Sequence, residues 1–346
     1  MAHGLAKRIP FARRLPTGRD AISDRFTAAL ICLNRHIPVR KVAAGSNRQI
    51  APLHAPLPVQ EAGREQFMAE HEVLTFDDLQ PHLLLKNGNF LYKIPYRDSW
   101  AVLKVYYGSR SHWQNVQKSI ENVSAGQTSY MPKTRLKVER ECLDVWRRHG
   151  FRVFGTYDDV EVRAPQCPEG GYMLFEYVDA PKLDACLRDT ERPLEERLEL
   201  FRRFLKEWGR RHEIAIRERE PRLVHENGDG KHVLIMEDGS LLWFDFEMIY
   251  RSRRKVSLHV CHEIIQYIWY LNRNSSPDFQ ERLLEETATH YPSRERLYAA
   301  YEYFFRHPNP LHRWGRALER HFKKSRGEAK SKYGVARRLK EQLDAL

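Results

Sequence analysis

The sequence lacks the features that mark several large classes of protein. It has no run of about 18 apolar residues, the length that a membrane-spanning helix needs, and its mean hydropathy is −0.65. Its five cysteines are scattered, and no two of them have the C-x-x-C spacing of a zinc or redox pair. We therefore expect a soluble globular protein in a reducing compartment, the cytoplasm.

The positive charge is concentrated at the two ends of the chain. The net charge is +12, and residues 1–60 and 306–346 each carry +8, which leaves 61–305 at −4. A nucleic-acid-binding domain usually carries its basic patch on the folded body. Cationic ends suit an anionic surface, either lipid headgroups or RNA. The alternative is solvated charge with no binding role.

Composition and pattern divide the chain into four parts. Residues 1–67 are basic and contain many prolines, with no sustained periodicity, so we expect a disordered extension. An alternative is that Met68 is the true start. Residues 68–178 form a first lobe, 179–305 a second lobe, and 306–346 a basic tail in which a charged surface helix begins near Trp314.

The first lobe has the pattern of an antiparallel meander followed by a helix. Short β-rich runs cover 83–86, 90–94 and 100–107, with turns between them. Between 133 and 150 the apolar residues recur at helical spacing and Gly150 follows as a stop signal. Further strands are predicted at 153–157, 161–163 and 172–178.

The second lobe is predicted to be mainly helical, with one hairpin. A single apolar stripe runs from Leu194 to Trp208, and helical patterns return at 256–271 and 297–305. Two short apolar runs, 233–236 and 241–246, flank the turn Glu237-Asp238-Gly239. The whole predicts an α+β chain of two lobes, the first β-rich with one helix.

The strongest functional signal lies around this hairpin. Residues 223–235 read LVHENGDGKHVLI and residues 243–247 read WFDFE. This segment resembles the H-G-D-x-x-x-x-N-V-L and I-D-F-E elements of atypical small-molecule and sugar kinases, and the H-R-D-x-x-x-x-N and D-F-G elements of protein kinases. The resemblance is closest to the lipopolysaccharide core (Kdo and heptose) kinases and covers roughly residues 83–275.

The resemblance implies a bilobal protein-kinase-like fold that binds ATP with Mg²⁺ or Mn²⁺. Lys104 ends the segment AVLK and would meet the nucleotide phosphates. Either Glu139 or Glu141 would pair with this lysine, and counting back from the end of the helix favours Glu139. The backbone from Glu176 to Val178 would form the hinge that contacts adenine, and no G-x-G-x-x-G loop covers the phosphates.

The catalytic loop departs from the family pattern at two positions. Asn227 stands where the family has the catalytic aspartate, and His232 stands where it has the asparagine that binds the second metal ion. An amide cannot accept a proton from the acceptor hydroxyl. Asp229, two residues further on, is a candidate substitute base.

The remaining site residues keep more usual roles. Asp245 is expected to be the primary metal ligand, with His232 as an altered second ligand. His225 is expected to brace the loop through a backbone hydrogen bond. Glu247 replaces the glycine of D-F-G and either holds metal or pairs with Arg251.

Three functions remain open from the sequence. The first is a phosphotransferase that acts on a sugar hydroxyl of lipopolysaccharide core or a related lipid-linked glycan, bound peripherally at the inner membrane face through its cationic ends. The second is a pseudokinase, a nucleotide-binding or scaffold protein with little turnover. The third is a kinase-like protein associated with RNA.

Overall fold

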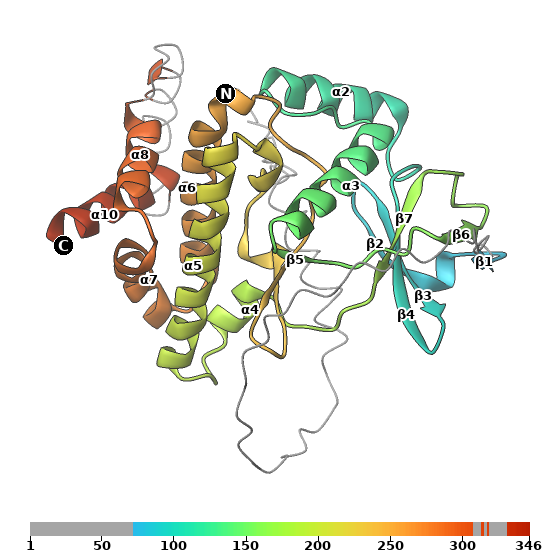
Figure 1. Cartoon of the computed structure of the whole chain (residues 1–346), viewed down its shortest axis with the longest axis horizontal. Coiled ribbons are helices and arrows are strands. Elements are labelled where there is room, and N and C mark those ends of the chain that lie inside the picture. The colour runs from blue at the N-terminus through green and yellow to red at the C-terminus, as the bar shows by residue number, and fades with distance from the viewer. Residues whose placement is uncertain (1–71, 307–312, 315–316, 318–330) are drawn as a thin grey trace, which may run out of the picture.

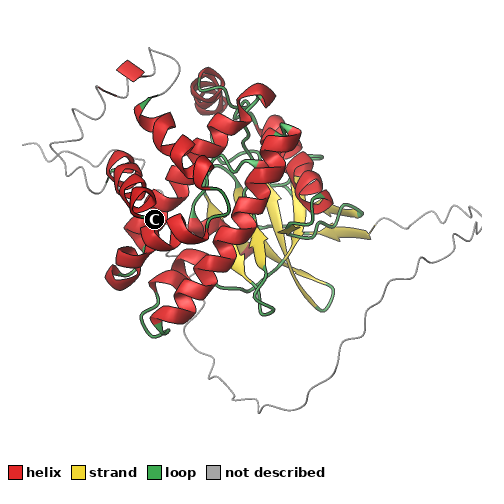
Figure 2. Cartoon of the chain, turned by 60° about the vertical axis from the view of Figure 1, so that its left-hand side comes forward, coloured by secondary structure: helices red, strands yellow, loops and turns green. Residues whose placement is uncertain are grey.

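The computed structural model describes residues 72–306, 313–314, 317 and 331–346 (Figure 1). The chain is of the α+β class: the strands gather on one side of the molecule and most of the helices on the other (Figure 2). The fold class that the sequence predicts is therefore confirmed at this level. The extension 1–67 lies outside the described residues.

The first half of the described chain is built on a four-stranded antiparallel sheet. Its order is β2-β3-β4-β7, with bounds β2 Leu83–Lys86, β3 Phe90–Tyr96, β4 Ser99–Val105 and β7 Tyr172–Glu176. The predicted meander is confirmed. A smaller parallel pair joins β1 (Glu72–Thr75), which the sequence did not predict, to β6 (Val160–Arg163).

Two helices, and not the single one predicted, follow the meander. The predicted helix is α3 (Pro132–Arg148), and before it lies α2 (His112–Ser124), which begins with a capping box at Ser111. The sequence signal for α2 is weak because its inward face is polar. On α3 the expected stripe, Val138, Cys142, Val145 and Trp146, is buried.

The second half is helical, as predicted. Its helices are α4 Leu183–Arg188, α5 Leu194–Glu218, α6 Val256–Asn274, α7 Pro277–His290, α8 Arg294–Phe305 and α10 Lys332–Ala345. Single turns of 3-10 helix lie at Gln80–His82, Pro221–Leu223, Gly230–His232 and Arg253–Lys255. The predicted hairpin is β8 (Val233–Ile235) and β9 (Leu241–Trp243), joined by β5 (Arg152–Val153) in the order β5-β9-β8.

The C-terminal helix corrects one prediction. The sequence predicts a charged surface helix in the basic tail, but α10 packs on α6, α7 and α8 and buries Tyr333, Val335, Ala336, Leu339 and Leu343. Arg337, Glu341 and Asp344 are exposed, whereas Lys332 and Arg338 donate to Gln266 and Asn272 of α6. The helix α10 thus belongs to the core of the helical half and is not a free basic arm.

No helix within the described ranges is both long and apolar enough to cross a membrane.

Candidate functional site

Lys104 lies on the face of β4 that points toward α3. Along β4, Ala101, Leu103 and Val105 pack into the core of the sheet, so the alternation of a strand turns Lys104 to the other side. There its Nζ lies 2.6 Å from Glu139 Oε2 and 2.7 Å from Glu247 Oε1. Burial alone would lower the pKa of Lys104, but Glu139 and Glu247 hold it above its ordinary value.

The helix α3 supplies Glu139 and not Glu141 to this lysine. Glu139 is buried and also accepts a hydrogen bond from Tyr106 Oη at 2.5 Å. Glu141 points elsewhere and lies 3.6 Å from Arg222 Nη1. The pair that the resemblance favours is therefore the one that forms.

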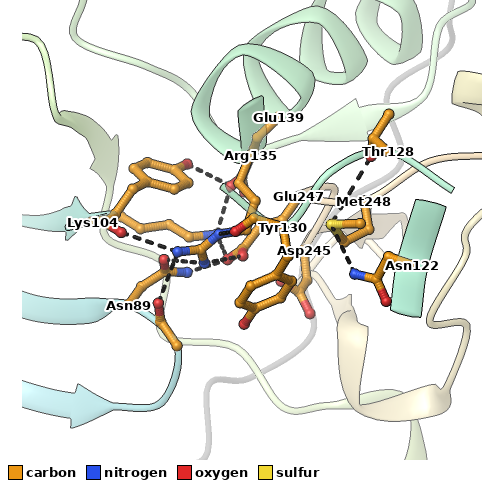
Figure 3. A network of polar contacts seen from close by, with 12 residues as sticks. Asn89, Lys104, Asn122, Thr128, Tyr130, Arg135, Glu139, Asp245, Glu247 and Met248 are labelled. Carbon is orange, nitrogen blue, oxygen red and sulfur yellow. Dashed lines mark hydrogen bonds and ion pairs between the residues drawn. The ribbon is translucent and has the colours of Figure 1, made fainter. Parts of the chain in front are cut away.

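Arg135 lies one helical turn before Glu139 and connects three segments around the lysine (Figure 3). Its Nη1 donates to Glu247 Oε2 at 2.8 Å and to Asn89 Oδ1 at 2.5 Å. Its other donors reach backbone carbonyls, Gly88 and Tyr106 at 3.0 Å and Tyr130 at 3.2 Å. The short turn between β2 and β3 is thus tied to α3 and to the segment after Asp245.

Glu247 corrects a prediction. The sequence offers either a metal site or an ion pair with Arg251, and the ion pair is not the one that forms: Glu247 pairs with Lys104 and Arg135 and accepts a short hydrogen bond from Asn89. Arg251 donates instead to the carbonyl of Val123.

His225 makes the expected hydrogen bond to a backbone group. Its Nε2 lies 3.2 Å from the backbone oxygen of Asp245, which can only accept, and its Nδ1 lies 2.8 Å from Tyr267 Oη. The Asp245 oxygen fixes Nε2 as a donor, and burial lowers the pKa of His225 to about 4. The backbone N–H of His225 donates to Glu263 Oε2 on α6 at 3.0 Å.

Asp245 follows β9 in a left-handed backbone conformation, with φ of 75°. Such a conformation in a residue other than glycine costs about 1 kcal/mol or more and is found most often at functional sites. Burial would raise the pKa of Asp245, but His232, where it is protonated, and the positive charge of Lys104 lower it below its ordinary value. Its carboxylate is therefore ionised at neutral pH.

His232 and Asp245 form a donor pair that suits a cation. His232 Nδ1 lies 3.2 Å from the carbonyl of Asn227 and 3.3 Å from Asp229 Oδ1, so this nitrogen must carry the proton. The other nitrogen, Nε2, lies 3.2 Å from Asp245 Oδ2. Because burial lowers the pKa of His232 to about 4, the neutral imidazole directs a lone pair at a carboxylate oxygen.

A shared divalent cation would relieve that contact. A metal-binding histidine usually donates its second N–H to a backbone carbonyl or carboxylate, as His232 does. One nitrogen and one carboxylate leave the remaining positions to phosphate oxygens and water, which is the usual arrangement for a nucleotide-bound metal ion. The described part of the chain holds no cluster of three or more metal-binding side chains.

Asp229 is less available than the sequence suggests. It is buried, caps the 3-10 turn at Gly230 and lies 2.9 Å from Lys231 Nζ. Burial raises its pKa to about 6, and Lys231 opposes that shift. Both of its oxygens have cationic or N–H partners, so the geometry does not favour Asp229 as a base.

Asn227 is exposed, and Glu226 beside it is the carboxylate that sequence reasoning missed. Glu226 accepts a short hydrogen bond from Gln127 Nε2, and burial raises its pKa to about 7. Its charge interacts with that of Asp245. No family pattern marks this position as catalytic, so the sequence carries no signal for it.

The expected hinge follows β7. Glu176 pairs with Ala101 of β4, and its carboxylate accepts from the backbone N–H of Gly155 at 2.7 Å. Val178 is half-buried, and the chain then runs past Pro181, whose carbonyl accepts from Ile235 of β8. This segment therefore runs from the sheet to the hairpin that precedes Asp245.

A scan against protein-family models and a search of curated proteins both found no match to this chain. The function must accordingly be argued from the residues of the site.

Proposed function

We propose that this chain is a phosphotransferase of the protein-kinase-like fold, which moves the γ-phosphoryl group of ATP to a sugar hydroxyl of lipopolysaccharide core or a related glycan. The observation that carries the proposal is the pairing of Lys104 with Glu139 beside Asp245. A strand lysine, a helix glutamate and an aspartate after a hairpin are the parts that hold nucleotide phosphates and metal in kinases.

The four-stranded sheet and the helical half would then be the two lobes of that fold. Lys104 would bind the nucleotide phosphates, and the backbone of 176–178 would contact adenine. His225 would position Asp245 through the bond to its carbonyl. A divalent cation held by Asp245 and His232 would neutralise the charge that develops on the phosphates.

The proton of the acceptor hydroxyl needs a base. The hydroxyl oxygen bonds to the γ-phosphorus while the bond to the bridging oxygen breaks, and ADP leaves with that electron pair. We assign the proton to Glu226, because the side chain that donates a hydrogen bond to it is the neutral Gln127, whereas Asp229 lies against the ammonium group of Lys231. A carboxylate with a pKa of about 7 is well matched to proton transfer at neutral pH.

A thermal-shift titration with ATP and Mg²⁺ or Mn²⁺ tests the nucleotide site. A ligand at 100 times its Kd stabilises the folded state by about 2.7 kcal/mol. Lys104→Ala and Asp245→Ala should each remove most of the shift, whereas Lys137→Ala, an exposed lysine on α3, should keep it. No shift in the parent protein at millimolar ATP would refute the assignment.

The second candidate is a pseudokinase. It is favoured by one observation: the position of the family's catalytic aspartate holds the exposed amide of Asn227. Release of ADP in the presence of candidate glycan acceptors decides between the two. Nucleotide binding without turnover, in the parent and in Asn227→Asp, would favour the pseudokinase.

A further inference from the structure

The helix α2 is amphipathic in the reverse of the usual sense. A helix on the surface of a globular protein normally turns its apolar stripe inward. In α2 the buried residue is Asn115, and the inward side also carries Ser119, whose hydroxyl accepts from the backbone N–H of Tyr130 at 3.0 Å. The polar face therefore contacts the protein.

The apolar stripe of α2 points to solvent. Trp113 is 79% exposed, Ile120 is 66% exposed and Val123 is 37% exposed. Their spacing of seven and three residues, with Val116 between them, places them along one side of the helix. Large exposed apolar side chains gathered on one side of a helix are a feature of interaction surfaces.

A dense basic cluster adjoins the end of this stripe. We define it as residues 251–255, which read RSRRK and contain no acid. Arg251 donates through Nη2 to the carbonyl of Val123 at 3.2 Å, and its backbone N–H donates to Gly126 at 2.9 Å. In Figure 1, α2 lies along the top of the molecule, and these hydrogen bonds join its C-terminal end to the cluster.

The cluster also borders a hollow in the surface. An open cleft of about 460 Å³ lies beside it, lined by Arg219, Arg253 and Arg254 and by Ile216, Val256 and Ser257. Arg253 is held at this edge by its hydrogen bond to the carbonyl of Arg219 at 3.1 Å. The cleft is cationic and of a size to admit an anionic headgroup.

We propose that α2 and the 251–255 cluster together form a docking face for an anionic phospholipid bilayer. Trp113 and Ile120 would enter the interface, where tryptophan is favoured, while the cluster binds the headgroup phosphates. Each basic residue near an anionic membrane surface adds to the attraction. The face lies on the described body of the protein and does not depend on the proposed phosphotransfer.

Charge complementarity favours a bilayer over the other occupants. A second copy packed through a two-fold axis would bring its own RSRRK segment toward the first, and like charges would repel. RNA could bind the basic cluster, but RNA binding does not explain why Ile120 and Val123 point to solvent. An anionic membrane surface would contact both the basic cluster and the exposed apolar side chains of α2.

The first experiment locates the contact. The full chain is mixed with vesicles of phosphatidylcholine containing about one-third phosphatidylglycerol, with bromine on the acyl chains as a tryptophan quencher. We expect quenching in the parent and in Trp314→Phe, a variant of another exposed tryptophan, and its loss in Trp113→Phe. Unaltered quenching in Trp113→Phe, or no binding by the parent, would overturn the proposal.

The second experiment measures affinity by vesicle flotation. Neutralising Arg253, Arg254 and Lys255 together to glutamine should weaken binding by about 10²-fold at low salt. Trp113→Ser with Ile120→Ser should weaken it by about tenfold or more. Each variant should keep the circular dichroism spectrum and Tm of the parent, because these side chains are exposed. Binding that both variants retain would place the contact elsewhere.

The same variants exclude the competing occupants. If Trp113 in the lipid-free protein were shielded from an aqueous quencher, another part of the chain or a second copy would cover it and the proposal would fail. Capture of RNA that requires the cluster but not Trp113, together with absent vesicle binding, would replace the bilayer by RNA.

Discussion

Replacing Arg135 by methionine should destabilise the protein severely, because this guanidinium is fully buried and connects α3 to two other segments. Methionine keeps the length of the side chain and the helix propensity but removes all the donors. Glu247 would lose one of its cationic partners, and the carbonyls of Gly88, Tyr106 and Tyr130 would lose a donor.

The expected magnitude follows from burial. Breaking a buried ion pair by removing one partner costs about 3–5 kcal/mol, since the remaining charge is left without compensation. For a protein of this size that corresponds to a fall in Tm of roughly 4–7 °C, since the unfolding entropy is about 2.1 cal/mol/K per residue. Arg135→Lys keeps the positive charge but loses the planar guanidinium group, so its loss of unfolding free energy should be smaller than that of Arg135→Met.

The matched control is Arg140→Met on the same helix. Arg140 is 54% exposed and lies 3.9 Å from Asp158 Oδ1, so that pair contributes about 0–1 kcal/mol. Urea unfolding followed by circular dichroism gives both free energies. An exposed ion pair contributes at most about 1 kcal/mol. If the losses of unfolding free energy in Arg135→Met and Arg140→Met differ by less than about that amount, the network around Arg135 does not stabilise the protein.

Three further predictions concern the loop. Because the pKa of Glu226 is raised to about 7 from 4.5, kcat should rise as the pH rises through about 7 and Glu226 loses its proton. Glu226→Gln should abolish this rise and lower kcat by about 10²–10⁴-fold. Protonation of Glu226 stabilises the folded state, so parental stability should fall between pH 4.5 and about 7, and Glu226→Gln should lack this fall in a Tm-against-pH series. Gly228→Ala should cost about 1–3 kcal/mol in urea unfolding, since its Cβ would lie 2.3 Å from the ring of Tyr267; an unchanged free energy of unfolding would contradict this packing.

The sequence predicts the elements of this fold better than it predicts the bonding inside the site. The meander, α3, α5 and the β8–β9 hairpin follow from periodicity and turn residues, which are local signals. The helix α2 has no inward apolar stripe, and α10 has charges that mask its buried face, so pattern reasoning missed the first and misplaced the second.

Within the site, the resemblance correctly favours Glu139 over Glu141, because a helix places only one of the two toward the sheet. It could not predict the contacts of Glu247 or Asp229. Those depend on which cation lies nearest after folding, Lys104 in one case and Lys231 in the other. Arg135 lies on the apolar face of its helix, and a charged residue at such a position is the sequence feature that indicates a buried polar network.

The charges of this network bear on how a nucleotide could bind. Lys104 and Arg135 are matched by Glu139 and Glu247, so the buried cluster is close to neutral before any phosphate approaches. A triphosphate placed beside Lys104 would also face the carboxylate of Asp245, whose pKa is held low. Its binding therefore requires either added positive charge or release of Glu247 from the lysine. Asp245 and His232 place one oxygen and one nitrogen close together, where a divalent cation would supply that charge. We therefore expect any nucleotide affinity to depend on the metal, and Glu247→Gln to lessen that dependence by removing one of the two carboxylates that compete for Lys104.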